Sequence, residues 1–342
     1  MDYVGPYESM EDVAQAGAKK ARLSVLEMLL RGFLSGALLA FATAIAFKVT
    51  EGLSGGAAFL VSAAVFPVGF AMIVIFGLEL LTGNFALLPV AIARGRTGYG
   101  ELARNWMWVF IGNLVGSTFF GVLLVFVLTE GFTQQGGPLA LKIIAVAQSK
   151  TLAYQHAGLA GWMTAFIKGM LCNWMVAMGT IIAFSSKSTI GKIAAIWLPI
   201  FMFFGLGFEH SVVNMFVIPT AMMLGAGISM QQWWIWNQIP VTLGNVVGAH
   251  CWLDCCSTRC SNPRHLPWRA VTGPRHALMA RRRRLKWRFR TKAGWRESVG
   301  IEPTSRVAPA SAVLKTVRAT RPVLSHNRES PLSVVYFRVC IL

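Results

Sequence analysis

The feature that most constrains the fold of this chain is an internal repeat at one fixed offset. Three markers recur 132 residues later: Pro67 as Pro199, Gly112-Asn113 as Gly244-Asn245, and Gly116 as Gly248. Polar residues also interrupt an apolar stretch near Thr82 and again near Asn214. Two related halves, each with a broken hydrophobic helix, are typical of membrane transporters and channels.

The composition supports a membrane protein. Hydrophobic residues make up 55% of the 342 residues and charged residues only 13%, whereas soluble domains carry about 25% charged residues. Six apolar stretches have the length of a membrane-crossing helix: 31–50, 57–78, 105–128, 161–184, 193–217 and 233–250. We therefore predict an all-α membrane protein with six transmembrane helices, arranged as two inverted three-helix repeats with helices two and five broken.

The distribution of basic residues predicts the orientation of the protein in the membrane, and the sequence also predicts the boundaries of an N-terminal segment and a transporter domain. They gather before span one, between spans two and three, and between spans four and five: Lys19, Lys20, Arg22, Arg31, Arg94, Arg96, Arg104, Lys187 and Lys192. The positive-inside rule places both termini in the cytoplasm of a multi-pass inner-membrane protein. Residues 1–30 lack a cleavable signal and are predicted as a cytoplasmic segment with a short amphipathic helix. The transporter domain is predicted at 31–250, with repeats at about 31–128 and 161–250.

The remaining residues, 251–342, form a basic tail with 19 Lys and Arg against 4 Asp and Glu and no helical or strand periodicity. Such a segment is predicted to be disordered. A zinc site formed by Cys251, Cys255, Cys256 and Cys260 with His250 or His265 is one alternative, although the spacing matches no usual pattern. Another is binding of nucleic acid or anionic lipid through the run 281–284. We favour a third alternative, a reading-frame shift near His250, and so predict no nucleic-acid partner and draw no function from the tail.

Polar residues inside the spans are the functional candidates, because ionisable groups in a membrane are costly. They are Glu79, Thr82, Asn84, Asn113, Lys168, Asn173, Glu209, His210, Asn214 and Asn245. The glycines Gly77 and Gly83 flank the first polar cluster, where a helix can unwind. The half-helix after such a break presents free N–H groups and a partial positive charge. Two inverted breaks therefore favour an anion at the membrane midplane.

His210 is the strongest candidate for a functional residue, since an imidazole there can donate a hydrogen bond or a proton to an anion. The alternative is a buried histidine that only packs. Glu209 lies about 100° around a helix from His210, which favours a structural role for its carboxylate. No metal site and no cofactor motif is predicted in the spans, and paired His/Cys ligands and a Gly-rich phosphate loop are lacking there, which argues against an enzyme.

Four segments carry a resemblance to a known family. They are 207–216 (GFEHSVVNMF), 168–176 (KGMLCNWMV), Asn105-Trp106 with 112–116, and 239–245 (IPVTLGN). These resemble the formate/nitrite transporter family over about residues 20–249. The resemblance implies an aquaporin-like protomer of six spans, two of them broken, in a homopentamer with one pore in each protomer.

The resemblance also implies residue roles. His210 corresponds to the central pore histidine, Thr82 to the threonine on the loop that breaks span two, and Asn245 to an asparagine that orients the histidine. Lys150 corresponds to a lysine of the outer vestibule, although extra residues separate it from span four. The implied constriction and pathway positions are Phe66, Phe70, Leu80, Asn173, Val176 and Phe203. Separately from the resemblance, we predict structural roles for the polar residues Glu209, Asn214 and Lys168.

The predicted function is transport of a small monovalent anion, formate first, across a lipid bilayer with the help of a proton. Stripping water from a bare anion is costly, and desolvation favours the neutral acid, so a proton accepted near His210 eases the crossing. Nitrite, hydrosulfide, acetate and lactate suit the same residues. A neutral-solute channel of aquaporin type and a non-functional product of a disrupted gene remain as alternatives.

Overall fold

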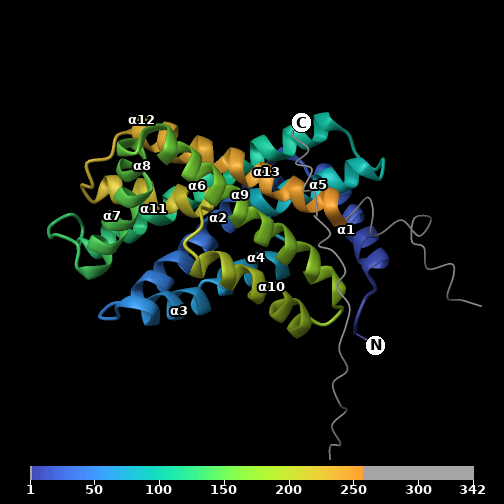
Figure 1. Ribbon diagram of the computed structural model, residues 1–342, viewed down its shortest axis with the longest axis horizontal. Helices are drawn as coiled ribbons and strands as arrows, with labels where there is room; N and C mark the ends of the chain where they lie inside the picture. Colours follow the sequence, from blue (N-terminus) through green and yellow to red (C-terminus); the bar gives the residue numbers. More distant parts are fainter. Residues whose placement is uncertain (1, 257–342) are drawn as a thin grey trace, which may run out of the picture. The chain divides into compact units, whose positions relative to one another are not determined.

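The computed structural model describes residues 2–256, and these are almost entirely helical (Figure 1). The α-helices are α1 (Pro6–Ala21), α2 (Val25–Lys48), α3 (Gly55–Val65), α4 (Pro67–Ile75), α5 (Leu81–Ala93), α6 (Tyr99–Leu128), α7 (Pro138–Lys150), α8 (Leu152–His156), α9 (Gly158–Ile182), α10 (Thr189–Gly205), α11 (Ser211–Met223), α12 (Met230–Trp233) and α13 (Ile239–Cys256). A 3₁₀ turn, η1 (Ala183–Ser185), follows α9, and a π-helical turn, η2 (Trp234–Gln238), precedes α13. The expectations for residues 257–342 lie outside the described residues.

Within residues 2–256, four helical stretches are long and apolar enough to cross a membrane: Val25–Lys48, Gly55–Ile75, Tyr99–Leu128 and Gly158–Ser185. Shorter apolar helices follow at Leu81–Ala93, Thr189–Gly205 and Ser211–Met223. With α13, this grouping is consistent with the six predicted spans. Both predicted breaks are present, because residues 76–80 separate α4 from α5 and residues 206–210 separate α10 from α11.

Some helix ends differ from the predicted ones. The first membrane helix begins at Val25 instead of residue 31, because Ser24 and Glu27 form a capping box in which Glu27 N–H donates to Ser24 Oγ at 3.3 Å. The backbone of α13 continues to Cys256, six residues beyond the predicted end of span six. Pro67 is the first residue of α4, directly after α3, whereas Pro199 lies inside the single helix α10.

Among the described residues, the repeated glycines lie in the two helix pairs with the most extensive contact, α2 with α6 and α9 with α13. A Cβ added at Gly116 of α6 would overlap the backbone carbonyl of Phe33 in α2. A Cβ added at Gly248 of α13 would overlap the carbonyl of Met170 in α9. Small residues let membrane helices approach closely, where burial of apolar side chains from lipid gives little driving force. The sequence repeat therefore marks two equivalent packing contacts.

We expect Gly116→Val to destabilise the protein by about 1–3 kcal/mol, because the two helix backbones must separate to admit the side chain. The same substitution at Gly100, in the first turn of α6, is the control, since a Cβ there meets nothing within 4 Å. Thermal unfolding in detergent, followed by tryptophan fluorescence, measures both. An equal loss of Tm in the two variants would contradict the close crossing.

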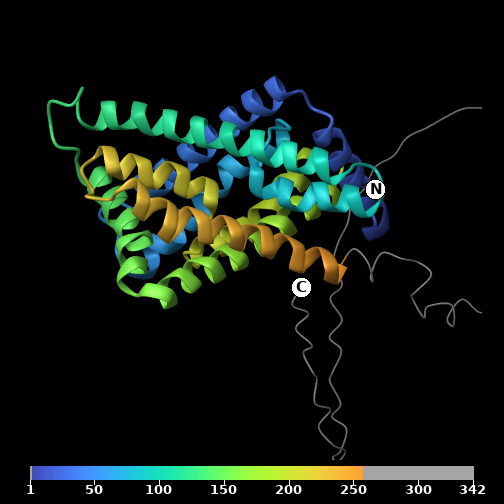
Figure 2. The same cartoon turned by 90° about the horizontal axis from the view of Figure 1, so that it is seen from above.

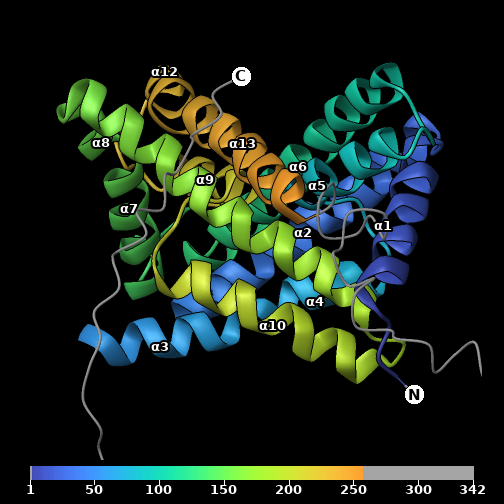
Figure 3. The ribbon, with the colours of Figure 1, turned by 45° about the vertical axis from the view of Figure 1, so that its right-hand side comes forward.

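The two ends of the helical body carry different elements (Figures 2 and 3). Helix α1 lies at one end beside α5, and α7 and α8 lie at the other. Basic residues from the two later groups contact α1, which itself carries Lys19 and Lys20: Arg94 pairs with Glu11 at 3.3 Å, Arg104 donates to Ala21 O at 2.9 Å, and Lys187 lies 3.9 Å from Glu8. The residues used to predict the cytoplasmic side therefore lie together.

Candidate functional site

The two helix breaks have the same local geometry. Gly77 and Gly207 both have φ of +65°, a conformation that favours glycine, and each turns the chain after the first half-helix. The backbone then runs extended into the next half-helix, with φ and ψ of −108° and 121° at Leu80 and −113° and 119° at His210. Leu80 and His210 therefore occupy equivalent positions, each at the N-terminus of a half-helix inside the protein.

His210 is buried, with 1% of its surface exposed, and contacts the other break directly. Its Nε2 lies 3.0 Å from Thr82 Oγ1, and its Nδ1 accepts the N–H of Val213 at 3.3 Å, which caps α11. Because an accepting Nδ1 needs a free lone pair, the neutral ring carries its hydrogen on Nε2 and donates to Thr82. The Thr82 hydroxyl then keeps its own proton for a further acceptor. The structure thus brings together the predicted pair His210 and Thr82.

Asn245 acts on the backbone beside His210. Its Oδ1 accepts the N–H of Ser211 at 2.9 Å, and its Nδ2 donates to the carbonyls of Glu209 at 3.0 Å and Gly169 at 2.8 Å. It holds both neighbours of His210 and makes no hydrogen bond with the imidazole. The orientation expected from Asn245 is therefore indirect, through the loop that carries the ring.

Asn113 does the same at the first break. Its Oδ1 accepts the N–H of Leu81 at 2.9 Å, and its Nδ2 donates to Glu79 O at 2.9 Å and Gly32 O at 2.8 Å. The repeated Gly-Asn pair thus combines a helix crossing with a clamp on the unwound backbone. Both breaks lack helical hydrogen bonds at membrane depth, where backbone groups must be satisfied inside the protein.

Beside each break, a lysine and a buried glutamate form an ion pair. Glu209 accepts from Lys150 Nζ at 2.7 Å, from Asn214 Nδ2 at 2.8 Å and from Tyr154 Oη at 2.8 Å. Asn237 accepts from Asn214 at 2.9 Å and donates to Lys150 O at 3.0 Å. Lys150, expected in the vestibule, is therefore ion-paired, and the structural role expected for Glu209 and Asn214 fits these contacts.

The equivalent cluster beside the first break contains Lys20, which the sequence analysis used only to predict the orientation of the protein in the membrane. Lys20 of α1 donates to Glu79 at 2.6 Å, and Asn84 donates to Glu79 at 2.7 Å and to Asn105 at 2.8 Å. The three residues recur 130 positions later, Lys20 as Lys150, Glu79 as Glu209 and Asn84 as Asn214. This second offset is the sequence signal that could have identified the first cluster.

Two cavities approach the breaks from opposite ends. The Lys150 cavity has a volume of about 530 Å³ and is lined by Lys142, Lys150, Tyr154, Lys168, Phe203, Glu209 and His210, among others. The Lys20 cavity, of about 190 Å³, is lined by residues including Lys20, Phe70, Leu80, Gly83, Asn84 and Thr180. Polar side chains thus face both cavities, and each cavity reaches one of the two breaks.

The predicted constriction residues are all buried, and Phe203, Phe70 and Leu80 each line one of these cavities. Phe203 lines the Lys150 cavity and stacks on the His210 ring, with centroids 5.8 Å apart. Phe66 packs edge-on against Phe203 with centroids 5.8 Å apart. Phe66 and Val176 have no exposed surface, and Phe70 and Leu80 line the Lys20 cavity. We call these buried side chains, of which Phe203 contacts His210, the apolar section.

Two further predicted residues lie near this section. Asn173 donates to Asn245 O at 2.7 Å and to Thr82 O at 3.2 Å, and among the described residues its Oδ1 has no hydrogen-bond partner. Lys168, expected as a structural residue, lines the Lys150 cavity with its ammonium 5.8 Å from the centre of the Tyr154 ring.

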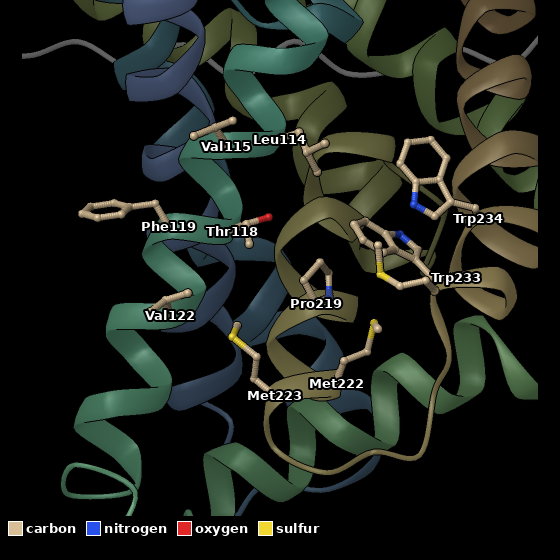
Figure 4. Close-up of a pocket in the computed structure, with 11 residues that line it drawn as sticks. Leu114, Val115, Thr118, Phe119, Val122, Pro219, Met222, Met223, Trp233 and Trp234 are labelled. Atoms are coloured by element: carbon tan, nitrogen blue, oxygen red, sulfur yellow. The ribbon is translucent and has the colours of Figure 1, made fainter.

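A third cavity, of about 570 Å³, lies apart from these residues between α6, α11 and α12 with η2 (Figure 4). Its lining is apolar apart from Thr118 and the two indole rings of Trp233 and Trp234, and it contains no charged side chain. Such a surface offers little to replace the water around an anion, so it is not the candidate anion path.

Comparison with known proteins agrees with the geometry. The family model described as formate/nitrite transporter matches residues 7–256. A probable formate transporter of Methanothermobacter thermautotrophicus is 38% identical, covering 73% of this chain and 95% of that protein. The formate channel FocA of Escherichia coli K12 is 31% identical, covering 72% and 90%.

Two solved structures are also similar. One is an FNT family ion channel, with a TM-score of 0.59, 27% identity, and coverage of 70% of this chain and 94% of that chain. The other is a pentameric formate channel with formate bound, with a TM-score of 0.54, 26% identity, and coverage of 68% and 95%. These matches, together with the apolar helices and the paired breaks, show that the chain is a multi-pass membrane transport protein belonging to the formate/nitrite transporter family.

Proposed function

We propose that this protein carries formate, as a small monovalent anion aided by a proton, across the inner membrane. The contact between His210 and Thr82 at the two breaks carries the proposal, since the two cavities approach it from opposite ends. The names of the relatives in Methanothermobacter thermautotrophicus and Escherichia coli support formate as the first substrate.

The proposed path runs from the Lys150 cavity, past His210 and Thr82, to the Lys20 cavity. In the apolar section beside Phe203 and Phe66 the anion loses most of its water. An isolated carboxylate pays a large desolvation penalty in such surroundings. Formate therefore crosses this section with a proton, as formic acid.

Hydrogen-bond donors at the centre hold the substrate while it gains or loses that proton. His210 donates through Nε2 to Thr82 Oγ1, and this leaves the Thr82 hydroxyl proton to donate to the substrate. The N-termini of α5 and α11 add partial positive charge at the same place. The His210 ring can take up a proton only by giving up its bond from Val213 N–H, so protonation and loop geometry are coupled.

The transport unit proposed here spans residues 31–250 as inverted repeats of about 31–128 and 161–250, and α1 adds Lys20 to it. The solved pentameric relative supports a homopentamer with one path in each subunit. The basic residues gathered at the α1 end support a cytoplasmic location for that end and for both termini.

Uptake of labelled formate into proteoliposomes that contain the full chain tests the proposal, at about pH 5.5 and about pH 7.5. We expect saturable flux that is faster at the acidic pH. Nitrite, acetate and hydrosulfide as competitors rank the other anions that suit the same residues. Absence of formate flux from correctly inserted protein overturns the proposed function, and it is the result that a disrupted gene product would give.

A further inference from the structure

The Lys150 cavity contains more positive than negative charge. Of the residues that the structure describes, three lysines line it, Lys142, Lys150 and Lys168, and one carboxylate, that of Glu209. The Lys20 cavity differs, since its only lysine, Lys20, is paired with Glu79 at 2.6 Å. An anion that enters from the Lys150 side therefore meets a cavity with a surplus of positive charge.

Two of the three lysines have polar partners that hold their charge in place. Lys150 Nζ lies 2.7 Å from Glu209 Oε2, and this pair is buried behind the break. Lys142 Nζ donates to Thr50 Oγ1 and is attracted by the carboxylate of Glu51. The charge of Lys150 is therefore balanced by a carboxylate, whereas Lys142 is held by a hydroxyl and shares Glu51 with Lys48, whose ammonium lies 2.7 Å from that carboxylate.

Lys168 differs from both. Its ammonium lies over the ring of Tyr154, and no carboxylate of residues 2–250 lies within 4.0 Å of it. The Tyr154 hydroxyl is already used, because it donates to Glu209 at 2.8 Å. A ring face attracts a cation but leaves the ammonium hydrogens free for an anion.

The backbone also places Lys168 beside the path. Its carbonyl accepts the N–H of Glu209 at 3.4 Å, so the residue is attached to the loop that carries His210. Its side chain lines the Lys150 cavity, which His210 and Phe203 also line. A charge at this point acts on an anion before the apolar section.

We propose that Lys168 supplies the charge in the Lys150 cavity that recruits the anion and delivers it toward His210. This inference rests on the proposed function. Lys168 acts on the approach of the anion and not on its crossing of the apolar section. Its removal should therefore raise KM and leave the maximal flux nearly unchanged.

The test compares formate uptake by the full chain with that of Lys168→Gln and Lys168→Arg, at low and high ionic strength. We expect Lys168→Gln to raise KM by about three- to tenfold at low salt, the effect of one partly hydrated charge at short range. Added salt should shrink this difference, because it screens the charge of the parent protein. Lys168→Arg should restore the low KM, since it keeps the charge.

Lys187→Gln is the matched control. Lys187 is exposed at the α1 end, and its ammonium lies 3.9 Å from Glu8, so the variant removes one positive charge far from the Lys150 cavity. We expect an unchanged KM. Thermal unfolding of each variant in detergent verifies that the fold is kept.

The outcomes separate this inference from the proposed function. An active parent whose KM and salt dependence are unchanged in Lys168→Gln overturns the role of Lys168 alone. A loss of maximal flux at constant KM also overturns it, because it shows a role in crossing. A properly inserted parent without formate flux overturns the proposed function and this inference together.

Discussion

Replacing His210 with asparagine is expected to give a folded protein whose formate flux no longer rises with acidity. Asparagine is among the best N-cap residues, so its side chain can still accept the N–H of Val213 that His210 Nδ1 accepts at 3.3 Å. It cannot take up a proton. The variant therefore removes the titrating group and keeps the cap of α11.

The measurement is the ratio of formate flux at about pH 5.5 to flux at about pH 7.5 in proteoliposomes. We expect the ratio to fall toward one, and the flux at the acidic pH to fall by about 100-fold if His210 transfers the proton itself. Thermal unfolding should change little, which separates this effect from misfolding.

Thr82→Val is the companion variant, because it removes the hydroxyl that lies 3.0 Å from His210 Nε2 without changing the imidazole. We expect slower flux that still depends on pH. If His210→Asn kept the ratio of the parent protein, this would contradict the role of His210 in proton transfer. Transport would then have to depend on the hydrogen bond that Thr82 donates to the substrate.

The breaks and the relation between the two halves could be predicted from the sequence because each depends on residues that few others can replace. Gly116 and Gly248 lie where a Cβ would overlap a carbonyl, and Asn113 and Asn245 each clamp an unwound backbone. These requirements are local and recur at one offset. The sequence repeat therefore carried the prediction that both halves share a fold.

The charged clusters could not be predicted with the same offset. Two additional residues lie between the break and the last helix in the second half, so Glu79 and Glu209 differ by 130 positions and not by 132. Lys20 also lies on α1, outside the predicted spans. Its contact with Glu79 arises from the packing of α1 against α5, which no local pattern reveals.

Glu209→Leu is expected to destabilise the protein by about 3 kcal/mol. Removing one partner of a buried ion pair leaves an uncompensated charge, which costs about 3–5 kcal/mol. The lower value applies because Lys150 lines a cavity, where its ammonium can regain some water. Asn214 and Tyr154 also lose the acceptor that they contact at 2.8 Å. Thermal unfolding in detergent measures the loss.

Three comparisons locate the cause of this loss. Glu209→Gln should lose less stability, since it keeps an acceptor oxygen, and the double variant Glu209→Leu with Lys150→Met should recover part of the loss by removing the unpaired charge. Glu8→Leu, at an exposed position 3.9 Å from Lys187, should change Tm little. Because Glu79 accepts from Lys20 and Asn84 as Glu209 does from Lys150 and Asn214, Glu79→Leu should cost a similar amount. A double variant no more stable than Glu209→Leu would show that the lost packing, and not the lone ammonium, destabilises the protein.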